Sequence, residues 1–275
     1  MKDLDQKETE EKRFLFGKNW KEFLKSLNQE KIDFSKKCLL DFLKEEDLKS
    51  KKFLDVGSGS GLSSLVAKLA GAEVHSFDYD INSVQCTEHL KQIYFSDDSK
   101  WKIEQGSALD AKYLESLGKF DIVYSWGVLH HTGEMYKALE LVEKNVADNG
   151  KLFISMYNDQ GFTSKIWHTI KRTYVNSPYL IKQLILFLCY FRLWGPTTIK
   201  DFIKLRPFYT WKEYGIQRGM SPRHDVVDWV GGYPFEVSKP EEIIHFFIKK
   251  GYNLKKLKTC GGGKGCNEFL FVKNK

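Results

Sequence analysis

Three glycines spaced two apart form the most distinctive stretch of the sequence. Residues 53–64 read FLDVGSGSGLSS, in which Gly57, Gly59 and Gly61 follow an apolar run containing Asp55. Glycines between a buried strand and a helix let the backbone approach a ligand closely, and a helix N-terminus favours negative charge. The stretch therefore predicts either a site for a nucleotide-like cofactor or a bare tight turn.

Two acidic residues favour the cofactor. Asp78 ends the next apolar run, about 20 residues after the glycines, where a carboxylate accepts hydrogen bonds from both ribose hydroxyls in dinucleotide-binding proteins. Asp110 follows a third run, where it could meet an adenine amino group. Because ligands of open α/β sheets bind at the carboxyl ends of the strands, we expect these groups along one sheet edge.

Two cofactors compete for such an edge. The dinucleotide fingerprint is G-x-G-x-x-G, and its third glycine permits close helix packing. Here Leu62 stands in the place of that glycine. The chain also ends in a predicted antiparallel hairpin instead of a second mononucleotide-binding half. Both features favour S-adenosyl-L-methionine over NAD.

Alternating strands and helices are expected to position these groups. Strand patterns cover residues 52–56, 72–80, 101–107, 120–126 and 151–158, with helical patterns between them, the last helix being ended by Asn149-Gly150. Such alternation indicates right-handed β-α-β units and a parallel sheet covered on both faces. A helix over 239–251 and a β-hairpin from 253–260 and 268–273 follow.

The chain divides into four expected parts. Residues 1–50 form an N-terminal helical cap, and 51–159 form the cofactor-binding core. Residues 160–238 are aromatic and interrupted by prolines, and so long an interruption is typical of a lid or an acceptor-binding insertion. Residues 239–275 complete the core sheet with a helix and a hairpin.

Composition indicates a folded chain in a reducing compartment. The 275 residues are 42% apolar and 29% charged, with a net charge of +7 from scattered lysines, which favours a solvated surface over a nucleic-acid surface. Five cysteines without a paired framework and a charged start predict a cytoplasmic protein.

The apolar run LILFLCYFRLW, residues 184–194, is too short to span a bilayer, so we expect no stable membrane insertion. Contact of this run with a membrane surface, a partner or the core stays open.

Four motifs, in order, carry a family resemblance: DVGSGSG, FDYD, EQGSALD and FDIVYSWGVLHHT. Over residues 50–158 they resemble the class I S-adenosylmethionine-dependent methyltransferases, in the small-molecule branch similar to quinone-biosynthesis methylases. The ends resemble a poorly characterised bacterial subgroup. The resemblance implies a doubly wound, mostly parallel seven-stranded Rossmann-like sheet with an antiparallel terminal hairpin strand and a helical lid. It also implies S-adenosyl-L-methionine as cofactor and S-adenosyl-L-homocysteine as product.

By position, the resemblance places cofactor contacts on four strand ends. The amino-acid end would meet the glycine loop, the ribose would meet the end of the second strand, the adenine would meet the end of the third, and the sulfonium would lie near the fourth. These residues are Asp55, Gly57, Ser58, Gly59 and Gly61, then Asp78 and Tyr79, then Ser107, Ala108 and Asp110, then Ser125 and Trp126.

Histidines are the candidate bases. Methyl transfer is an in-line displacement that needs alignment and exclusion of water, and oxygen acceptors often need a base as well. His130 and His131 follow the fourth strand, where they could act as a base, cap a helix or stack on adenine. His224 and Asp228 stand four apart and form either a base with its orienter or a surface pair. No tight spacing of ligand residues predicts a metal site.

Aromatic and polar residues are candidates for the acceptor pocket, with core packing and a solvent-exposed hairpin as the alternatives. The glycine-rich hairpin loop should lie at the same sheet end as the cofactor. The candidates are Trp20, Tyr157, Asn158, Tyr233, Asn267 and Glu268.

The sequence thus predicts an S-adenosylmethionine-dependent methyltransferase that acts on a small-molecule acceptor, at oxygen, such as a sugar, a quinone-like ring or another metabolite. A nucleic-acid methyltransferase is one alternative, but SWGVLHHT replaces the Asn/Asp-Pro-Pro-aromatic motif usual in base-modifying members, so no nucleic-acid partner is expected. A cofactor-binding module without catalysis is another alternative. A homodimer is left open.

Overall fold

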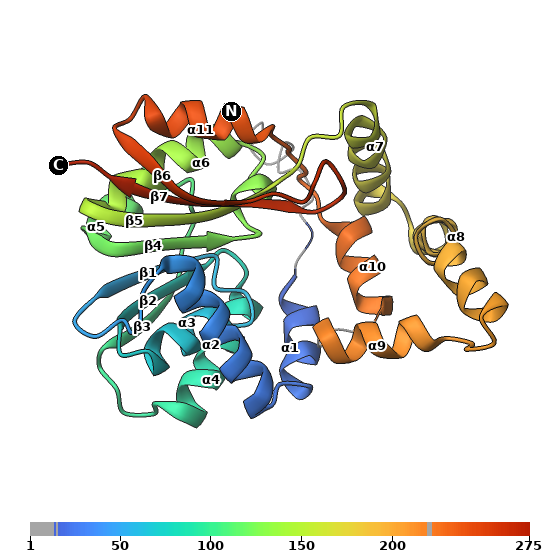
Figure 1. The fold of residues 1–275 in the computed structure, drawn as a ribbon, viewed down its shortest axis with the longest axis horizontal. Coiled ribbons are helices and arrows are strands. Elements are labelled where there is room, and N and C mark those ends of the chain that lie inside the picture. Colours follow the sequence, from blue (N-terminus) through green and yellow to red (C-terminus); the bar gives the residue numbers. More distant parts are fainter. Residues whose placement is uncertain (1–13, 15, 219–221) are drawn as a thin grey trace, which may run out of the picture.

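The computed structural model describes residues 14, 16–218 and 222–275 and contains a seven-stranded sheet (Figure 1). The strands lie in the order β3-β2-β1-β4-β5-β7-β6. The first five are parallel, and β7 is antiparallel to both β5 and β6, so the predicted fold class is confirmed. The strands are β1 (Lys52–Val56), β2 (Glu73–Asp78), β3 (Trp101–Gln105), β4 (Phe120–Trp126), β5 (Val146–Tyr157), β6 (Tyr252–Lys258) and β7 (Cys266–Lys273).

Helices cover both faces of the sheet because every central strand is apolar on both sides. One buried cluster joins the sheet to α5 (Ala111–Leu117), α6 (Met135–Val142) and α11 (Pro240–Ile248). The other joins it to α2 (Gln29–Leu43) and α3 (Leu62–Leu69), with α4 (Ile81–Tyr94) beside them. Parallel strands buried on both faces are what β-α-β connections produce.

The insertion forms a helical layer beyond the carboxyl ends of the strands (Figure 1). It contains α7 (Phe162–Asn176), α8 (Tyr179–Ile203), α9 (Tyr209–Arg218) and α10 (Pro222–Gly231), which share a third buried cluster rich in aromatic side chains. The N-terminal helix α1 (Gly17–Lys25) lies between this layer and α4 (Figure 1). Within the described residues, no helix combines the length and apolarity needed to cross a bilayer.

The predicted helix end at Asn149-Gly150 is wrong. Helix α6 ends at Val142, a short 3-10 turn η2 (Glu143–Asn145) follows, and β5 already begins at Val146. Val146 pairs with Phe120 of β4, and Asn149 adopts a left-handed backbone with φ of 59° inside the strand. Asparagine tolerates that conformation, so the Asn-Gly pair marks an irregularity in β5 instead of a helix cap.

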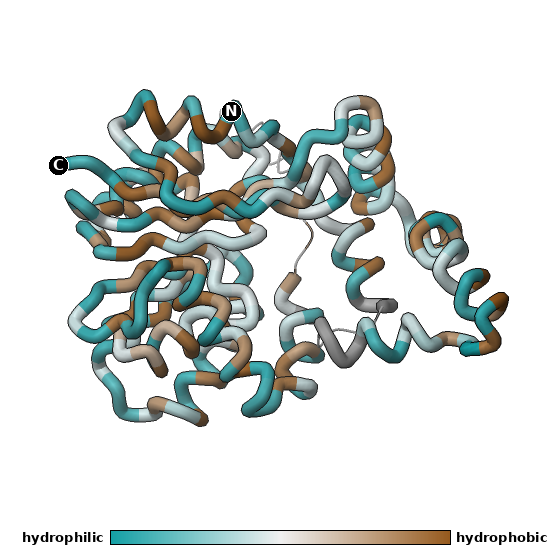
Figure 2. Tube along the Cα trace, viewed as in Figure 1, coloured by the Kyte–Doolittle hydropathy of each residue, from teal (hydrophilic) through white to brown (hydrophobic). Residues whose placement is uncertain are grey.

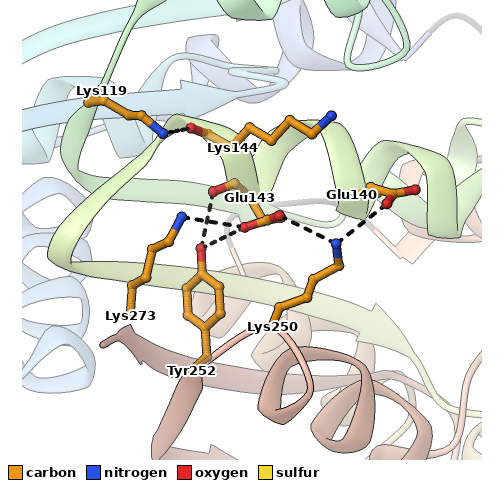
Figure 3. Close-up of polar contacts among 7 residues, drawn as sticks. All are labelled: Lys119, Glu140, Glu143, Lys144, Lys250, Tyr252 and Lys273. Carbon is orange, nitrogen blue, oxygen red and sulfur yellow. Dashed lines mark hydrogen bonds and ion pairs between the residues drawn. The ribbon is translucent and has the colours of Figure 1, made fainter. Parts of the chain in front are cut away.

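A polar cluster joins the β6–β7 hairpin to η2, the turn that precedes β5 (Figure 3). The Tyr252 hydroxyl lies 3.1 Å from a carboxylate oxygen of Glu143. Lys250 and Lys273 flank the same carboxylate at 3.4 and 3.7 Å. Burial raises the pKa of the Tyr252 hydroxyl, so it stays a hydrogen-bond donor. The cluster holds β6 and β7 in place from the side away from the glycine loop.

Candidate active site

The glycine loop is tied to the end of β2. The backbone N–H groups of Gly57 and Ser58 both donate to the Phe77 carbonyl, and the N–H of Gly59 donates to a carboxylate oxygen of Asp78 at 2.9 Å. Gly57 has a φ of 79°, and a Cβ added there would lie 2.5 Å from the Val128 side chain. Positive φ and close packing therefore both require glycine at this position.

We expect Gly57→Ala to destabilise the fold by about 1–3 kcal/mol, because it adds a steric clash to backbone strain. Urea unfolding monitored by tryptophan fluorescence measures the change. The matched control is Gly251→Ala, since Gly251 has a φ of 81° but open space around its missing Cβ. Equal losses in the two variants would show that contact with Val128 contributes nothing.

Asp78 lies where the sequence predicts it, at the junction of loop and strand. Its second carboxylate oxygen accepts the N–H of Asp80 at 2.8 Å, and burial raises its pKa to about 6. Asp80 caps α4 through Asn82 and also accepts the N–H of Gly17 from α1. The acidic pair thus joins the glycine loop to both helices.

Trp20 of α1 covers the glycine loop. A Cβ at Gly59 would lie 3.1 Å from the indole nitrogen of Trp20, so only glycine lets the loop pass this close to the ring. The sequence places Trp20 far from the loop, and the Asp80–Gly17 bond is what brings α1 across. Trp20 therefore lies at the candidate cofactor edge, and its place in an acceptor pocket stays a prediction.

Asp55 is buried beneath the loop. The Ser64 hydroxyl donates to its carboxylate at 2.5 Å, and Ser64 in turn lies 2.6 Å from the Ser76 hydroxyl. Burial raises the pKa of Asp55 to about 7. This chain of hydrogen bonds fixes the first turn of α3 against β1 and β2, so Asp55 supports the loop from below. Direct contact between Asp55 and the cofactor stays a prediction.

The end of β3 adds the predicted adenine edge. The N–H of Gly106 donates to the Asp78 carbonyl, so this loop starts beside the candidate ribose site. Ala108 is buried, and the Ser107 hydroxyl accepts the N–H of Leu109. Asp110 is exposed and caps α5 by accepting the N–H of Tyr113. Capping occupies one carboxylate oxygen of Asp110 and fixes its direction.

Two half-exposed aromatic rings flank the edge. Tyr79 is 54% exposed and Trp126 is 46% exposed, while the neighbouring Ser125 is buried and donates to the Val56 carbonyl. The indole of Trp126 donates to Glu268 at 3.2 Å, so β4 meets the hairpin there. Gly127 follows with a φ of 78°, and a Cβ added to it would meet no atom within 4 Å. A carboxylate, a glycine cradle and flat exposed rings fit an adenosyl cofactor.

Next to this edge, at the ends of β4 and β5, aromatic rings pack into a cluster, which we call the aromatic chamber although the rings fill it. The His130 ring lies 4.0 Å from the Tyr157 ring and 4.7 Å from the His131 ring. His131 contacts the Pro234 carbonyl through Nδ1 at 2.6 Å. Burial lowers the pKa of His131 to about 3 and that of His130 well below its usual range. Both imidazoles are therefore neutral and weak bases in this state.

Lys171 of α7 is wholly buried in the same chamber. Its ammonium nitrogen donates to the Trp229 carbonyl and lies 4.3 Å from the Trp229 ring centre and 4.7 Å from that of Phe235. Burial lowers its pKa to about 7. The sequence motifs did not point to this residue, although a lysine four residues after Trp167 and three before Tyr174 stands out on the apolar face of a helix.

Asp228 of α10 faces α1. Its carboxylate accepts a hydrogen bond from the Asn19 side chain, next to Trp20. Burial raises its pKa to about 7, with Lys171 acting in the opposite direction. A carboxylate with a near-neutral pKa is a candidate general base. The sequence singles out Asp228 only as a partner of His224, whose side chain lies outside the described residues.

The other predicted acceptor residues divide into two groups. Asn158 and Asn267 meet, since the Asn267 amide donates to the Asn158 side-chain oxygen at 3.0 Å and its own oxygen accepts the N–H of Cys260. They brace the glycine-rich hairpin loop, which lies at the cofactor edge as predicted. Tyr233 is buried and packs its ring against His168 inside the helical layer.

A hollow lined by Lys52, His75, Lys102 and Lys119 lies at the amino ends of the strands, on the opposite edge of the sheet. None of the predicted site residues lines it. We therefore place the candidate site at the carboxyl ends of the strands, where the glycine loop, the rings of Tyr79 and Trp126 and the carboxylate of Asp78 lie.

The fold and the loop together define a Rossmann-like, cofactor-binding protein. The family model described as "Methyltransferase domain" matches residues 24–189, more than half of the chain. The chain therefore belongs to this family of S-adenosylmethionine-dependent methyltransferases, as its motifs predicted.

Curated relatives match over short segments. The ribosomal protein L11 methyltransferase of Prochlorococcus marinus is 38% identical over 87 residues, which are 30% of this chain and 28% of that protein. The histidine protein methyltransferase 1 homolog of Dictyostelium discoideum is 29% identical over 123 residues, 42% of this chain and 39% of that protein. The chain thus spans less than half the length of these relatives.

Solved structures share the fold. Magnesium protoporphyrin IX methyltransferase from Synechocystis, solved with bound S-adenosylhomocysteine, covers 90% of this chain over 83% of its own length, with a TM-score of 0.50 and 15% identity. PKMT2 from Rickettsia typhi in complex with AdoHcy has a TM-score of 0.54 and 18% identity, over 83% of this chain and 51% of that one.

Proposed function

We propose that the protein transfers a methyl group from S-adenosyl-L-methionine to an oxygen atom of a small-molecule acceptor. The observation that carries the proposal is the hydrogen bond between Asp228 and Asn19, whose neighbour in α1, Trp20, lies against Gly59 of the glycine loop. Its raised pKa lets it take up a proton near neutral pH. The acceptor would lie between α1, α10 and the chamber at the ends of β4 and β5.

Each part of the site has one task in this proposal. Asp78 holds the ribose, the glycine loop makes room for the amino-acid end, and Tyr79 and Trp126 border the adenosyl group. The bound cofactor supplies a methyl group already activated by its sulfonium. Asp228 accepts the hydroxyl proton as the acceptor oxygen forms its bond to carbon and the carbon–sulfur bond breaks. The aromatic rings exclude water from the acceptor.

Asp228→Asn tests the base. We expect turnover to fall by about a hundredfold or more, because general bases contribute about 10²–10⁴-fold. Calorimetric affinity for S-adenosylhomocysteine should stay unchanged. In the unmodified protein, turnover should decrease as the pH falls below about 7, because the carboxylate is then protonated. This decrease in turnover below pH 7 should be absent in Asp228→Asn.

The matched control is Asp225→Asn on the same helix, whose carboxylate accepts a hydrogen bond from Tyr214. If both substitutions reduce turnover equally, Asp228 acts through the helix and not as a base.

The acceptor screen uses radiolabelled cofactor with phenols, sugars and hydroxyquinones, together with ribosomal proteins, since two curated relatives are named for protein substrates. Labelling of proteins alone would replace the small-molecule proposal.

None of the five cysteines, all of which lie in the described part of the chain, forms a disulfide. Unpaired thiols favour a reducing compartment such as the cytoplasm, which we include in the proposal.

A further inference from the structure

Helix α8 exposes an extended apolar surface. Nine large apolar side chains on it are each more than half exposed, and six of these are named here the α8 face. They recur at helical spacing, so they lie along one side of the helix. The α8 face consists of Leu180, Leu184, Phe187, Leu188, Phe191 and Phe202.

The opposite side of α8 already has its packing partners. Leu186, Cys189 and Trp194 are buried in the aromatic cluster of the helical layer. The α8 face is therefore additional apolar surface, not the side that holds the helix in place. Figure 2 shows hydrophobic residues along α8 and the turn after it, on the part of the molecule farthest from the sheet. Exposed apolar surface of this extent marks an interaction site.

Arg192 borders this face, since it directly follows Phe191 and stands four residues after Leu188. Arg192 and Lys200 are exposed on α8, and Lys204 is exposed at its C-terminal cap. The acidic residue of the helix, Asp201, is buried and accepts hydrogen bonds from the N–H and the hydroxyl of Thr210. The exposed charge on the described helix is thus positive, and Arg192 stands next to leucine and phenylalanine side chains of the face.

We propose that the α8 face docks on the surface of a membrane that carries anionic lipids. Helices that lie in the membrane interface combine leucine and aromatic side chains on one face with lysine and arginine around it. Long basic side chains extend to the headgroups while their stems lie on apolar surface. Each basic residue near an anionic surface adds attraction.

A second copy of the chain fits this surface less well. A twofold contact with antiparallel helices would set the α8 face against itself and bring Arg192, which lies near the middle of α8, close to Arg192 of the other copy. The cores of protein interfaces are also depleted in lysine. Arg192 at the border of the face and the positive exposed charge of α8 therefore favour a negatively charged partner surface.

Vesicle flotation of the full chain tests the proposal, with vesicles of phosphatidylcholine alone and of phosphatidylcholine mixed with phosphatidylglycerol. We expect binding to the mixed vesicles to exceed binding to the neutral ones by about tenfold or more, and to weaken in high salt. The double variant F187E/F191E should lose this binding by about tenfold or more, since both charges would enter the interface.

The control is Phe34→Glu, which places the same charge on an exposed phenylalanine of α2. It should bind vesicles like the unmodified protein, and unchanged thermal unfolding of all variants would show that the fold is intact. Absence of binding to the mixed vesicles, or equal binding by F187E/F191E, would overturn the proposal. A dimer in size-exclusion chromatography that F187E/F191E dissociates, without vesicle binding, would assign the face to a second copy instead.

Discussion

Replacing Lys171 with methionine is expected to stabilise the protein while reducing methyl transfer. The lysine is wholly buried and has a pKa lowered to about 7, so its ammonium is held in the fold at a cost in stability. Methionine fills a similar volume without a charge, and we expect a gain of about 2 kcal/mol at pH 7 after the lost hydrogen bond to Trp229 is deducted. Buried groups that lower stability are typical of functional sites.

The pH dependence of stability tests the cause. Between pH about 7 and 10.5, unfolded Lys171 holds a proton that the folded chain has released, so the stability of the unmodified protein should rise over this range. Below pH 7 both states are protonated and the penalty is complete. The advantage of K171M should therefore be largest at and below pH 7 and disappear toward pH 10.5.

Chemical unfolding at several pH values measures this advantage. Lys165→Met, on an exposed position of the same helix, is the control and should change stability by less than about 0.5 kcal/mol. A K171M variant less stable than the unmodified protein at pH 7 would mean that the contacts to Trp229 and Phe235 outweigh desolvation. Full turnover in K171M would show that Lys171 takes no part in methyl transfer.

Asp78→Ala is expected to weaken binding of S-adenosylhomocysteine by about tenfold to a hundredfold, as for the loss of a hydrogen bond to a charged group. The carboxylate also holds the N–H of Gly59, so the loop loses its anchor as well. Titration calorimetry measures the affinity. In the unmodified protein, the affinity should decrease as the pH falls through about 6, because the carboxyl then becomes protonated.

Asp121→Ala is a matched control. Asp121 also accepts a backbone N–H, from Lys52, but at the amino end of β4. Its replacement should leave cofactor affinity unchanged. Equal affinity in Asp78→Ala and the unmodified protein would contradict the ribose assignment. NADH titrated in parallel should show no binding, and binding of NADH alone would contradict the choice of cofactor.

The sequence by itself determined the architecture and the cofactor edge. Apolar runs of strand length alternate with helical periodicity from β1 to β5, and this pattern allows little other than a parallel, doubly wound sheet. Glycine spacing and the acidic residue Asp78 then located the loop, because positive φ angles and strand-end carboxylates are encoded locally. The prediction that Asn149-Gly150 ends a helix was wrong because asparagine and glycine, which often end helices, also occur at irregular positions within strands.

Only the tertiary structure shows which residues lie together on the side where we propose that the acceptor binds. Asp228 bonds to Asn19, the neighbour of Trp20, and interacts electrostatically with Lys171. These residues come from three helices, and no local pattern in the sequence indicates this arrangement. Burial among aromatic rings moves the pKa of Lys171 and Asp228 toward neutrality and keeps His131 neutral. The apolar run at 184–194 was also ambiguous in sequence, since periodicity shows that a helix has an apolar side but not whether another element covers it. Packing covers one side of α8 and leaves the other exposed.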